Sequence, residues 1–166
     1  MRQGRNVQLG NESTDRRLKM HFSINVDTTV CRLYKNIPYY KGMIIAGDFR
    51  ESLDIILNYW SLEDYRRQWR EAIDRLRTHD TSCFVTSIAG PKLGGLIIWP
   101  LYKQGEIVTI QNYMYGKRDY KKRIGRKVFN TQNCYEFVPK YVNKSQCGRT
   151  YSEWRIALSE LLDTKF

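Results

Sequence analysis

The chain has 166 residues and a formal net charge of +11; 42% of its residues are hydrophobic and 27% are charged. This length is typical of one domain, and this composition is typical of a globular protein, which excludes a disordered chain. No apolar run approaches the roughly 20 residues that a membrane-spanning helix needs, and the first residues lack the apolar centre of a secretory signal. We therefore expect a folded protein that stays in the cytoplasm and contacts no membrane.

Residues 1–19 are polar and show little periodic pattern, so we expect an N-terminal extension before a single domain that spans residues 20–166. From Met20 the sequence MHFSINV alternates apolar and polar residues as a half-buried strand does, and residues 30–34 predict a second strand. The Pro and Gly of NIPYYKG predict a turn between strands. Residues 49–59 fit either a strand or a helix face, and we favour the strand.

The clearest predicted element is an amphipathic helix from about residue 62 to residue 77. Ser61 can cap its first turn, and Asp64 stands where a capping box needs its acidic residue. The apolar residues that share one face of this helix are Leu62, Tyr65, Trp69, Ala72, Ile73 and Leu76. Glu and Arg alternate one turn apart on the opposite face, so we expect that face to be solvated scaffold rather than a nucleic-acid contact.

The sequence after residue 80 predicts an antiparallel meander of three strands, at residues 83–88, 96–102 and 107–113. The glycines of GPKLGG predict a hairpin turn and not a phosphate loop, because a strand follows them and no Lys-Ser or Lys-Thr does. A short helix is expected near residues 131–137, before Pro139, and a final strand within YSEWRIAL. The predicted fold class is α+β, with a mostly antiparallel sheet, one main amphipathic helix and one short helix.

Residue types suited to catalysis or metal binding are few. Cys31, Cys83, Cys134 and Cys147 are widely spaced without a C-x-x-C pair, which predicts reduced thiols rather than a disulfide framework or a zinc site. His79 follows the main helix, where an imidazole interacts favourably with the helix dipole. No motif of a serine hydrolase, a zinc protease or a calcium loop is present. We expect no catalytic residue, no metal site and no cofactor, and hence no enzyme.

Positive charge is concentrated in residues 111–149, which hold ten Lys or Arg and two acidic residues. Seven of the ten lie in GKRDYKKRIGRK, which we interpret as a loop between sheet elements. The predicted partner-binding residues are Lys117, Arg118, Tyr120, Lys121, Lys122, Arg123, Arg126 and Lys127.

Two classes of partner fit this basic segment, and a third interpretation is a merely solvated sheet edge. RNA or single-stranded nucleic acid fits because aromatic residues that can stack on bases interleave with the cations. These aromatic residues are Tyr113, Tyr115, Tyr120, Phe129 and Tyr135. A protein with an acidic face fits the same charge, since Tyr and Arg are enriched at the centres of protein interfaces.

Four stretches of the sequence occur in an order that resembles one protein family. They are YWSLEDYRRQWREAIDRLRTHDTSC, PLYK, KRIGRKVFNTQNCYEFVP and SEWRIAL, and the family is the immunity proteins of contact-dependent growth inhibition (CDI) systems of Gram-negative bacteria. The resemblance covers most of residues 59–158. It implies a cytoplasmic protein that binds, one to one, the C-terminal toxin domain of a cell-surface effector and blocks that toxin without chemistry of its own.

The positive charge of the chain is unexpected for such an inhibitor. Many toxins of this kind are nucleases with cationic binding surfaces, for which an acidic inhibitor is expected. Either the cognate toxin presents an acidic face, or the basic segment faces away from the interface.

Overall fold

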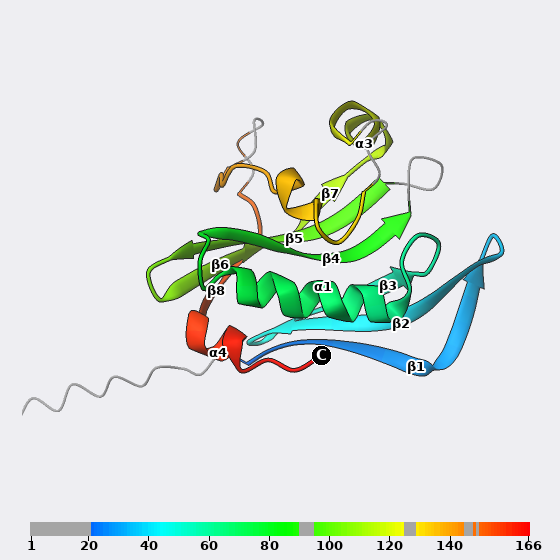
Figure 1. Cartoon of the computed structure of the whole chain (residues 1–166), viewed down its shortest axis with the longest axis horizontal. Coiled ribbons are helices and arrows are strands. Elements are labelled where there is room, and N and C mark those ends of the chain that lie inside the picture. Colours follow the sequence, from blue (N-terminus) through cyan, green and yellow to red (C-terminus); the bar gives the residue numbers. More distant parts are fainter. Residues whose placement is uncertain (1–20, 90–94, 125–128, 145–147, 149) are drawn as a thin grey trace, which may run out of the picture.

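The computed structural model describes residues 21–89, 95–124, 129–144, 148 and 150–166. Its strands form two antiparallel sheets (Figure 1). The first sheet has the order β1 (Phe22–Tyr34), β2 (Ile37–Ala46) and β3 (Phe49–Ile56). The second sheet has the order β4 (Thr81–Ala89), β5 (Gly95–Gln104), β6 (Ile107–Gln111) and β8 (Glu153–Ala157). The short strand β7 (Tyr113–Tyr115) pairs with the first part of β5.

The helical elements are α1 (Leu62–Arg75), α3 (Lys117–Arg123), α4 (Leu158–Leu162) and the 3₁₀ helix η1 (Cys134–Phe137). The predicted α+β class with mostly antiparallel pairing is confirmed. Every helix in the described part of the chain is too short or too polar to cross a bilayer.

The main predicted helix is confirmed as α1, which begins and ends close to the predicted residues. The backbone N–H of Asp64 donates to Ser61 Oγ at 3.2 Å, and the backbone N–H of Ser61 donates to Asp64 Oδ2 at 2.9 Å. This reciprocal pair is the predicted capping box, so a local signal determined where the helix begins. The helix predicted near residues 131–137 is the single 3₁₀ turn η1.

The start of the first sheet corrects two predictions. The predicted turn between strands exists, but its placement at the Pro and Gly of NIPYYKG is wrong, because residues 37–42 belong to β2. The hairpin instead turns at Lys35 and Asn36, whose φ angles of 50° and 63° suit a two-residue hairpin. Gly42 serves strand pairing, since a Cβ there would lie 3.0 Å from the carbonyl oxygen of Asn25 in β1. The two strands predicted before residue 35 are one strand, β1, interrupted by a bulge.

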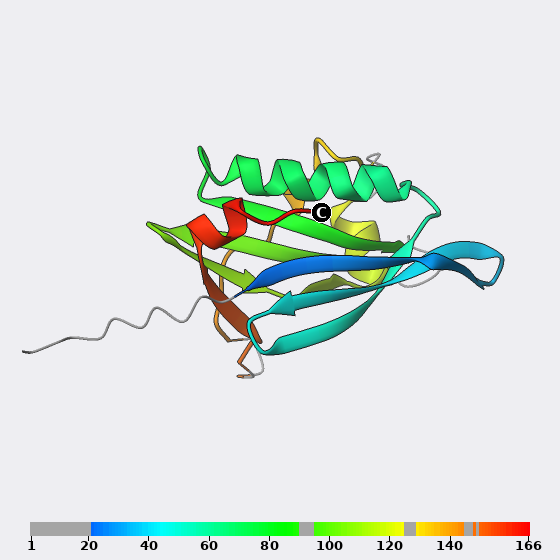
Figure 2. The ribbon, with the colours of Figure 1, turned by 90° about the horizontal axis from the view of Figure 1, so that it is seen from below.

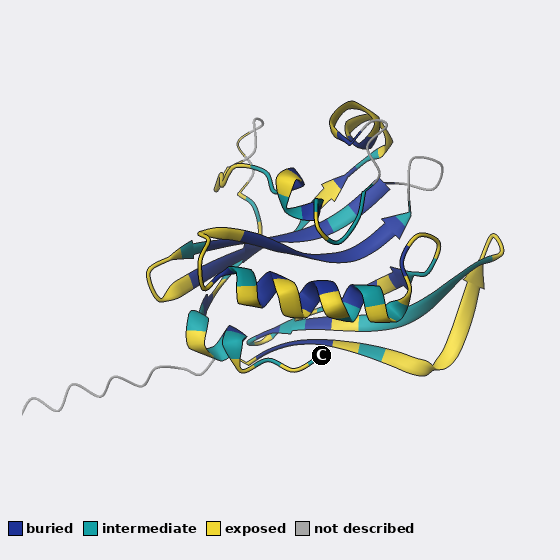
Figure 3. Cartoon of the chain, viewed as in Figure 1, coloured by how far each residue is buried: buried dark blue, intermediate teal, exposed yellow. Residues whose placement is uncertain are grey.

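One hydrophobic core lies between the two sheets and α1. Phe22 of β1 stacks on Phe84 of β4 with ring centroids 5.2 Å apart. The ring centroids of Phe49 in β3 and Trp154 in β8 lie 4.0 Å apart. The ring centroid of Trp154 lies 5.7 Å from that of Trp99 in β5. Figure 3 shows buried positions along both sheets, whereas the far half of β1 is exposed.

The outer edge of β4 is covered by α1, which runs along this strand in both ribbon views (Figures 1 and 2). Gln68 replaces a neighbouring strand: its Nε2 donates to the Cys83 carbonyl at 2.7 Å, and its Oε1 accepts from the Val85 N–H at 3.0 Å. Trp69 Nε1 donates to the Val85 carbonyl at 2.7 Å. Tyr65 accepts from the N–H of Ile88. The helix therefore satisfies backbone groups that an uncovered edge strand would leave open to another chain.

Replacing Gln68 by alanine is expected to lower the free energy of unfolding by about 2 to 3 kcal/mol, because one buried N–H and one buried carbonyl lose their partners. Denaturant unfolding measures this loss. Arg70→Ala is the matched control on the same helix, since it removes only an exposed ion pair with Glu63 and should cost less than about 1 kcal/mol. Equal effects of the two substitutions would contradict this role for Gln68.

Candidate functional site

The basic segment forms the helix α3 and not the predicted loop. Tyr120 and Ile124, one helical turn apart, are 9% and 2% exposed and pack into the core. Gly95 allows the helix to lie here, because its φ of 111° suits glycine and a Cβ would clash with the carbonyl of Tyr115, just before α3. The two buried side chains fix one face of α3, so its charged side chains point to solvent.

Four cations of α3 form an exposed surface that we call the α3 basic surface: Lys117, Arg118, Lys121 and Lys122. Within the described ranges no carboxylate lies within ion-pair distance of any of them, whereas seven ion pairs form elsewhere in those ranges. Their positive potential is therefore available to a partner in solution.

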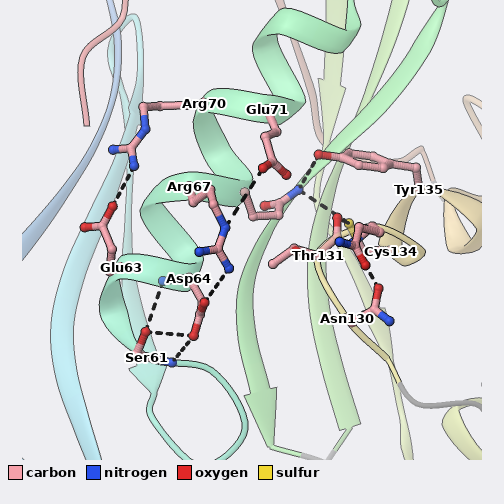
Figure 4. Close-up of polar contacts among 12 residues, drawn as sticks. Ser61, Glu63, Asp64, Arg67, Arg70, Glu71, Asn130, Thr131, Cys134 and Tyr135 are labelled. Carbon is pink, nitrogen blue, oxygen red and sulfur yellow. Dashed lines mark hydrogen bonds and ion pairs between the residues drawn. The ribbon is translucent and has the colours of Figure 1, made fainter.

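Arg67 and Arg70 of α1, and Arg77 just after it, are paired with carboxylates, in contrast to the cations of the α3 basic surface. Arg67 Nη2 lies 2.5 Å from Asp64 Oδ1, and Arg70 Nη2 lies 2.6 Å from Glu63 Oε1 (Figure 4). Further along, Arg77 lies 3.4 Å from Asp74. Each carboxylate cancels much of the field of its arginine, so α1 offers a partner little net charge. This agrees with the interpretation of α1 as scaffold.

Arg123 differs from the other cations of α3 because it has a contact within the protein. Its guanidinium carbon lies 5.9 Å from the ring centroid of Tyr115. Tyr115 is buried and its hydroxyl donates to the carbonyl of Phe137. Burial raises the pKa of Tyr115 to about 12, although the charge of Arg123 opposes this rise. Arg123 thus holds the end of α3 against the sheet, in addition to any contact with a partner.

The remaining predicted partner-binding residues do not lie on the α3 basic surface. Tyr120 is buried in the core beneath α3, so its side chain is not available to a partner. Arg126 and Lys127 lie outside the described residues. Two of the aromatic residues expected to stack on bases also serve the core: Tyr115 is fully buried, and Phe129 packs between aromatic rings of the core.

Two exposed apolar residues beside α3 were not predicted. Met114 of β7 is 65% exposed and lies three residues before the helix. Tyr59 is 55% exposed, and its proximity to Tyr120 contributes, after burial, to the raised pKa of Tyr120. The alternation in the sequence YMY could have indicated Met114, because a strand that buries Tyr115 turns the preceding side chain outward. Exposed Met and Tyr beside cations are typical of protein interfaces.

The residue types associated with chemistry include one contacting pair, Cys83 and Cys134. His79 contacts the hydroxyl of its neighbour Thr78 at 2.8 Å. Among the described residues, no three His, Cys, Asp or Glu side chains are grouped as metal ligands would be. Cys31, Cys83 and Cys134 are free thiols, and contact with Cys134 together with burial raises the pKa of Cys83, which makes its thiol a poor nucleophile.

Two antiparallel sheets, an edge covered by a helix and an unpaired basic surface define a small α+β protein. The family model of the CdiI N-terminal domain matches residues 55–164, and the chain belongs to this family. The resemblance expected from the sequence is thereby confirmed.

Two comparisons with known proteins are consistent with membership of this family. The protein "Immunity protein CdiI" of Enterobacter cloacae subsp. cloacae is 28% identical over 130 residues, which are 72% of this chain and 80% of that protein. A chain of the solved "CdiA-CT/CdiI toxin and immunity complex from Enterobacter cloacae" has the same fold, with a TM-score of 0.71 at 23% identity. The match covers 86% of this chain and 94% of that chain.

Proposed function

We propose that this chain is an immunity protein that binds the toxin domain of a cognate CDI effector and neutralises it. The observation that carries the proposal is the family match over residues 55–164, together with the similarity to an immunity protein over 72% of the chain. The protein acts in the cytoplasm as a one-to-one binder without catalysis, and residues 20–166 act as one domain.

The α3 basic surface is the part of the protein that we propose to face the toxin. Its four cations lack ion-pair partners among the described residues, and Met114 and Tyr59 add apolar contact area beside them. Such a surface fits a toxin that presents carboxylates around an apolar centre. If this acidic face lies outside the substrate-binding cleft of the toxin, a basic inhibitor can bind the toxin even when the cleft itself is cationic.

Nucleic acid is a weaker candidate for the same surface. Base stacking needs accessible aromatic rings, but Tyr115 and Tyr120 are buried. If about five cations neutralised phosphates, affinity would fall roughly 500-fold between 50 and 200 mM salt. A protein interface keeps most of its binding energy over this range, because its buried core is insensitive to salt.

Co-expression with the cognate toxin domain tests the proposed function. We expect the two chains to purify together at 200 mM salt as a one-to-one complex, and cells that carry both to grow. A toxin domain from an unrelated effector is the control and should neither bind nor be neutralised. Absence of both complex and rescue, together with tight, salt-sensitive binding of RNA, would overturn the proposal.

A further inference from the structure

The tip of the β1–β2 hairpin carries apolar side chains that the core does not bury. Val30, Leu33 and Tyr34 of β1 are 51%, 69% and 56% exposed. Figure 3 shows this end of β1 as exposed. Successive strand residues face opposite sides of a sheet, so Leu33 lies on the other face of β1, and Tyr34 is an exposed apolar side chain of the outer face at this tip.

A pocket of about 80 Å³ opens on the outer face of the first sheet, beside this tip. Its lining residues are Tyr34, Ile37, Tyr39, Asp54 and Ile56. The strand register brings them together, because Tyr34 pairs with Ile37 and Tyr39 pairs with Ile56. We call this the hairpin pocket.

The rim of the hairpin pocket is positively charged. Lys41 Nζ lies 2.6 Å from Asp54 Oδ1 and so neutralises the one carboxylate of the lining. The same ammonium lies 5.5 Å from the ring centroid of Tyr39, and Lys35 Nζ lies 5.4 Å from that of Tyr34. Within the described ranges Lys35 has no ion-pair partner. The hairpin pocket is therefore mainly apolar and lies beside the unpaired ammonium of Lys35.

The chain links the hairpin pocket to the α3 basic surface. The N–H of Leu57 donates to the Pro38 carbonyl at 2.9 Å, which joins the connection after β3 to β2 close to the tip of the hairpin. Two residues later comes exposed Tyr59, whose electrostatic interaction with Tyr120 of α3 adds to the effect of burial in raising the pKa of Tyr120. In both ribbon views this connection lies between α3 and the hairpin tip along the long axis of the molecule (Figures 1 and 2). The two surfaces carry charge of the same sign, so one acidic partner fits both.

We propose that the hairpin pocket receives an aliphatic side chain that protrudes from the toxin, flanked there by carboxylates that meet Lys35 and the α3 basic surface. This inference rests on the proposed function. The volume of the hairpin pocket indicates which side chain fits. A cavity of about 150 Å³ accepts benzene. The pocket, at about 80 Å³, therefore suits the side chain of Leu, Ile or Met better than an aromatic ring. An apolar anchor that fills such a pocket is a typical hot spot of binding.

Opening the pocket tests the proposal. Tyr34→Ala removes one wall, and we expect the dissociation constant for the cognate toxin domain to rise about 30-fold, through faster dissociation and equally at 50 and 200 mM salt. Ile37→Trp fills the pocket from within and should weaken binding in the same way. Leu33→Ala is the matched control: Leu33 is the more exposed neighbour and points to the opposite face of β1, so affinity should change less than about threefold.

The outcomes separate this inference from the proposed function. Thermal unfolding first shows whether both pocket variants are folded. If they are, and if they bind the toxin domain as tightly as the unchanged chain does, the pocket proposal is overturned and the proposed function stands. If the unchanged chain does not bind the toxin domain, both the proposed function and the pocket proposal are overturned. If the free chain self-associates and Tyr34→Ala abolishes this, a second copy occupies the pocket and the proposal is likewise overturned.

Discussion

Replacing Trp69 by alanine is expected to lower the free energy of unfolding by about 3 to 5 kcal/mol, as truncation of a large buried aromatic residue does. Trp69 is fully buried in the middle of α1. Its ring lies 6.2 Å from that of Tyr65 and 5.5 Å from that of Phe166, and its indole N–H donates to the Val85 carbonyl. The substitution thus removes packing between helix, strand and C-terminus, and also leaves a carbonyl of the β4 edge without its donor.

Denaturant unfolding of graded variants measures this effect. Trp69→Phe keeps an aromatic ring but loses the hydrogen bond, so its loss of stability should be clearly smaller than that of Trp69→Ala. In a growth test, Trp69→Ala should lose protection through unfolding, without any change in the residues that contact the toxin. An unfolding midpoint equal to that of the unchanged chain would show that Trp69 does not hold α1 on the sheet.

Reversing three charges of α3 is expected to slow association with the toxin domain about 100-fold at low ionic strength, because steering by opposite charges is replaced by repulsion. The variant carries Lys117→Glu, Arg118→Glu and Lys121→Glu. The first two positions lie in the first turn of α3, where a carboxylate interacts favourably with the helix dipole, so stability should be kept. Arg123 is left in place because it contacts Tyr115.

The control for this variant reverses two arginines on α1 and one just after it. Arg67→Glu, Arg70→Glu and Arg77→Glu change the net charge by the same amount on a surface whose cations are paired. Rapid-mixing kinetics at 50 and 200 mM salt should show a large, salt-dependent loss for the α3 variant and a small loss for the control. Equal losses would mean that only net charge matters. No loss in the α3 variant would show that this surface faces away from the toxin.

Local signals in the sequence account for the elements predicted correctly. The capping box of Ser61 and Asp64 and the apolar face behind it depend only on residues within one helix, and α1 follows them closely. The run of motifs from residue 59 to residue 158 likewise predicted the family. A further local signal was available for α3, since Tyr120 and Ile124 have helical spacing, but the density of cations around them suggested a loop.

Signals that depend on distant partners were misread. Gly42 stands in a sequence that resembles a turn, yet its role is to let β1 and β2 approach closely, and that role is set by Asn25 on another strand. Likewise, Gln68 resembles any polar residue on an amphipathic helix. Its amide is buried because it completes the hydrogen bonds of β4, which a periodic pattern within α1 does not reveal.

The sequence by itself determined the fold class, the position of the main helix, the concentration of charge in one segment and the family of the protein. The first three follow from composition or from neighbours within a few turns of chain, and the family follows from the order of motifs along residues 59–158. The tertiary structure decided which cations are neutralised and which aromatic residues are accessible. Side-chain pairing and burial depend on the distances that the folded chain sets, so only the folded protein shows that Arg67 and Arg70 of α1 are paired and that Tyr120 is in the core. The same holds for Tyr34, Tyr39 and Ile56, which meet around one pocket.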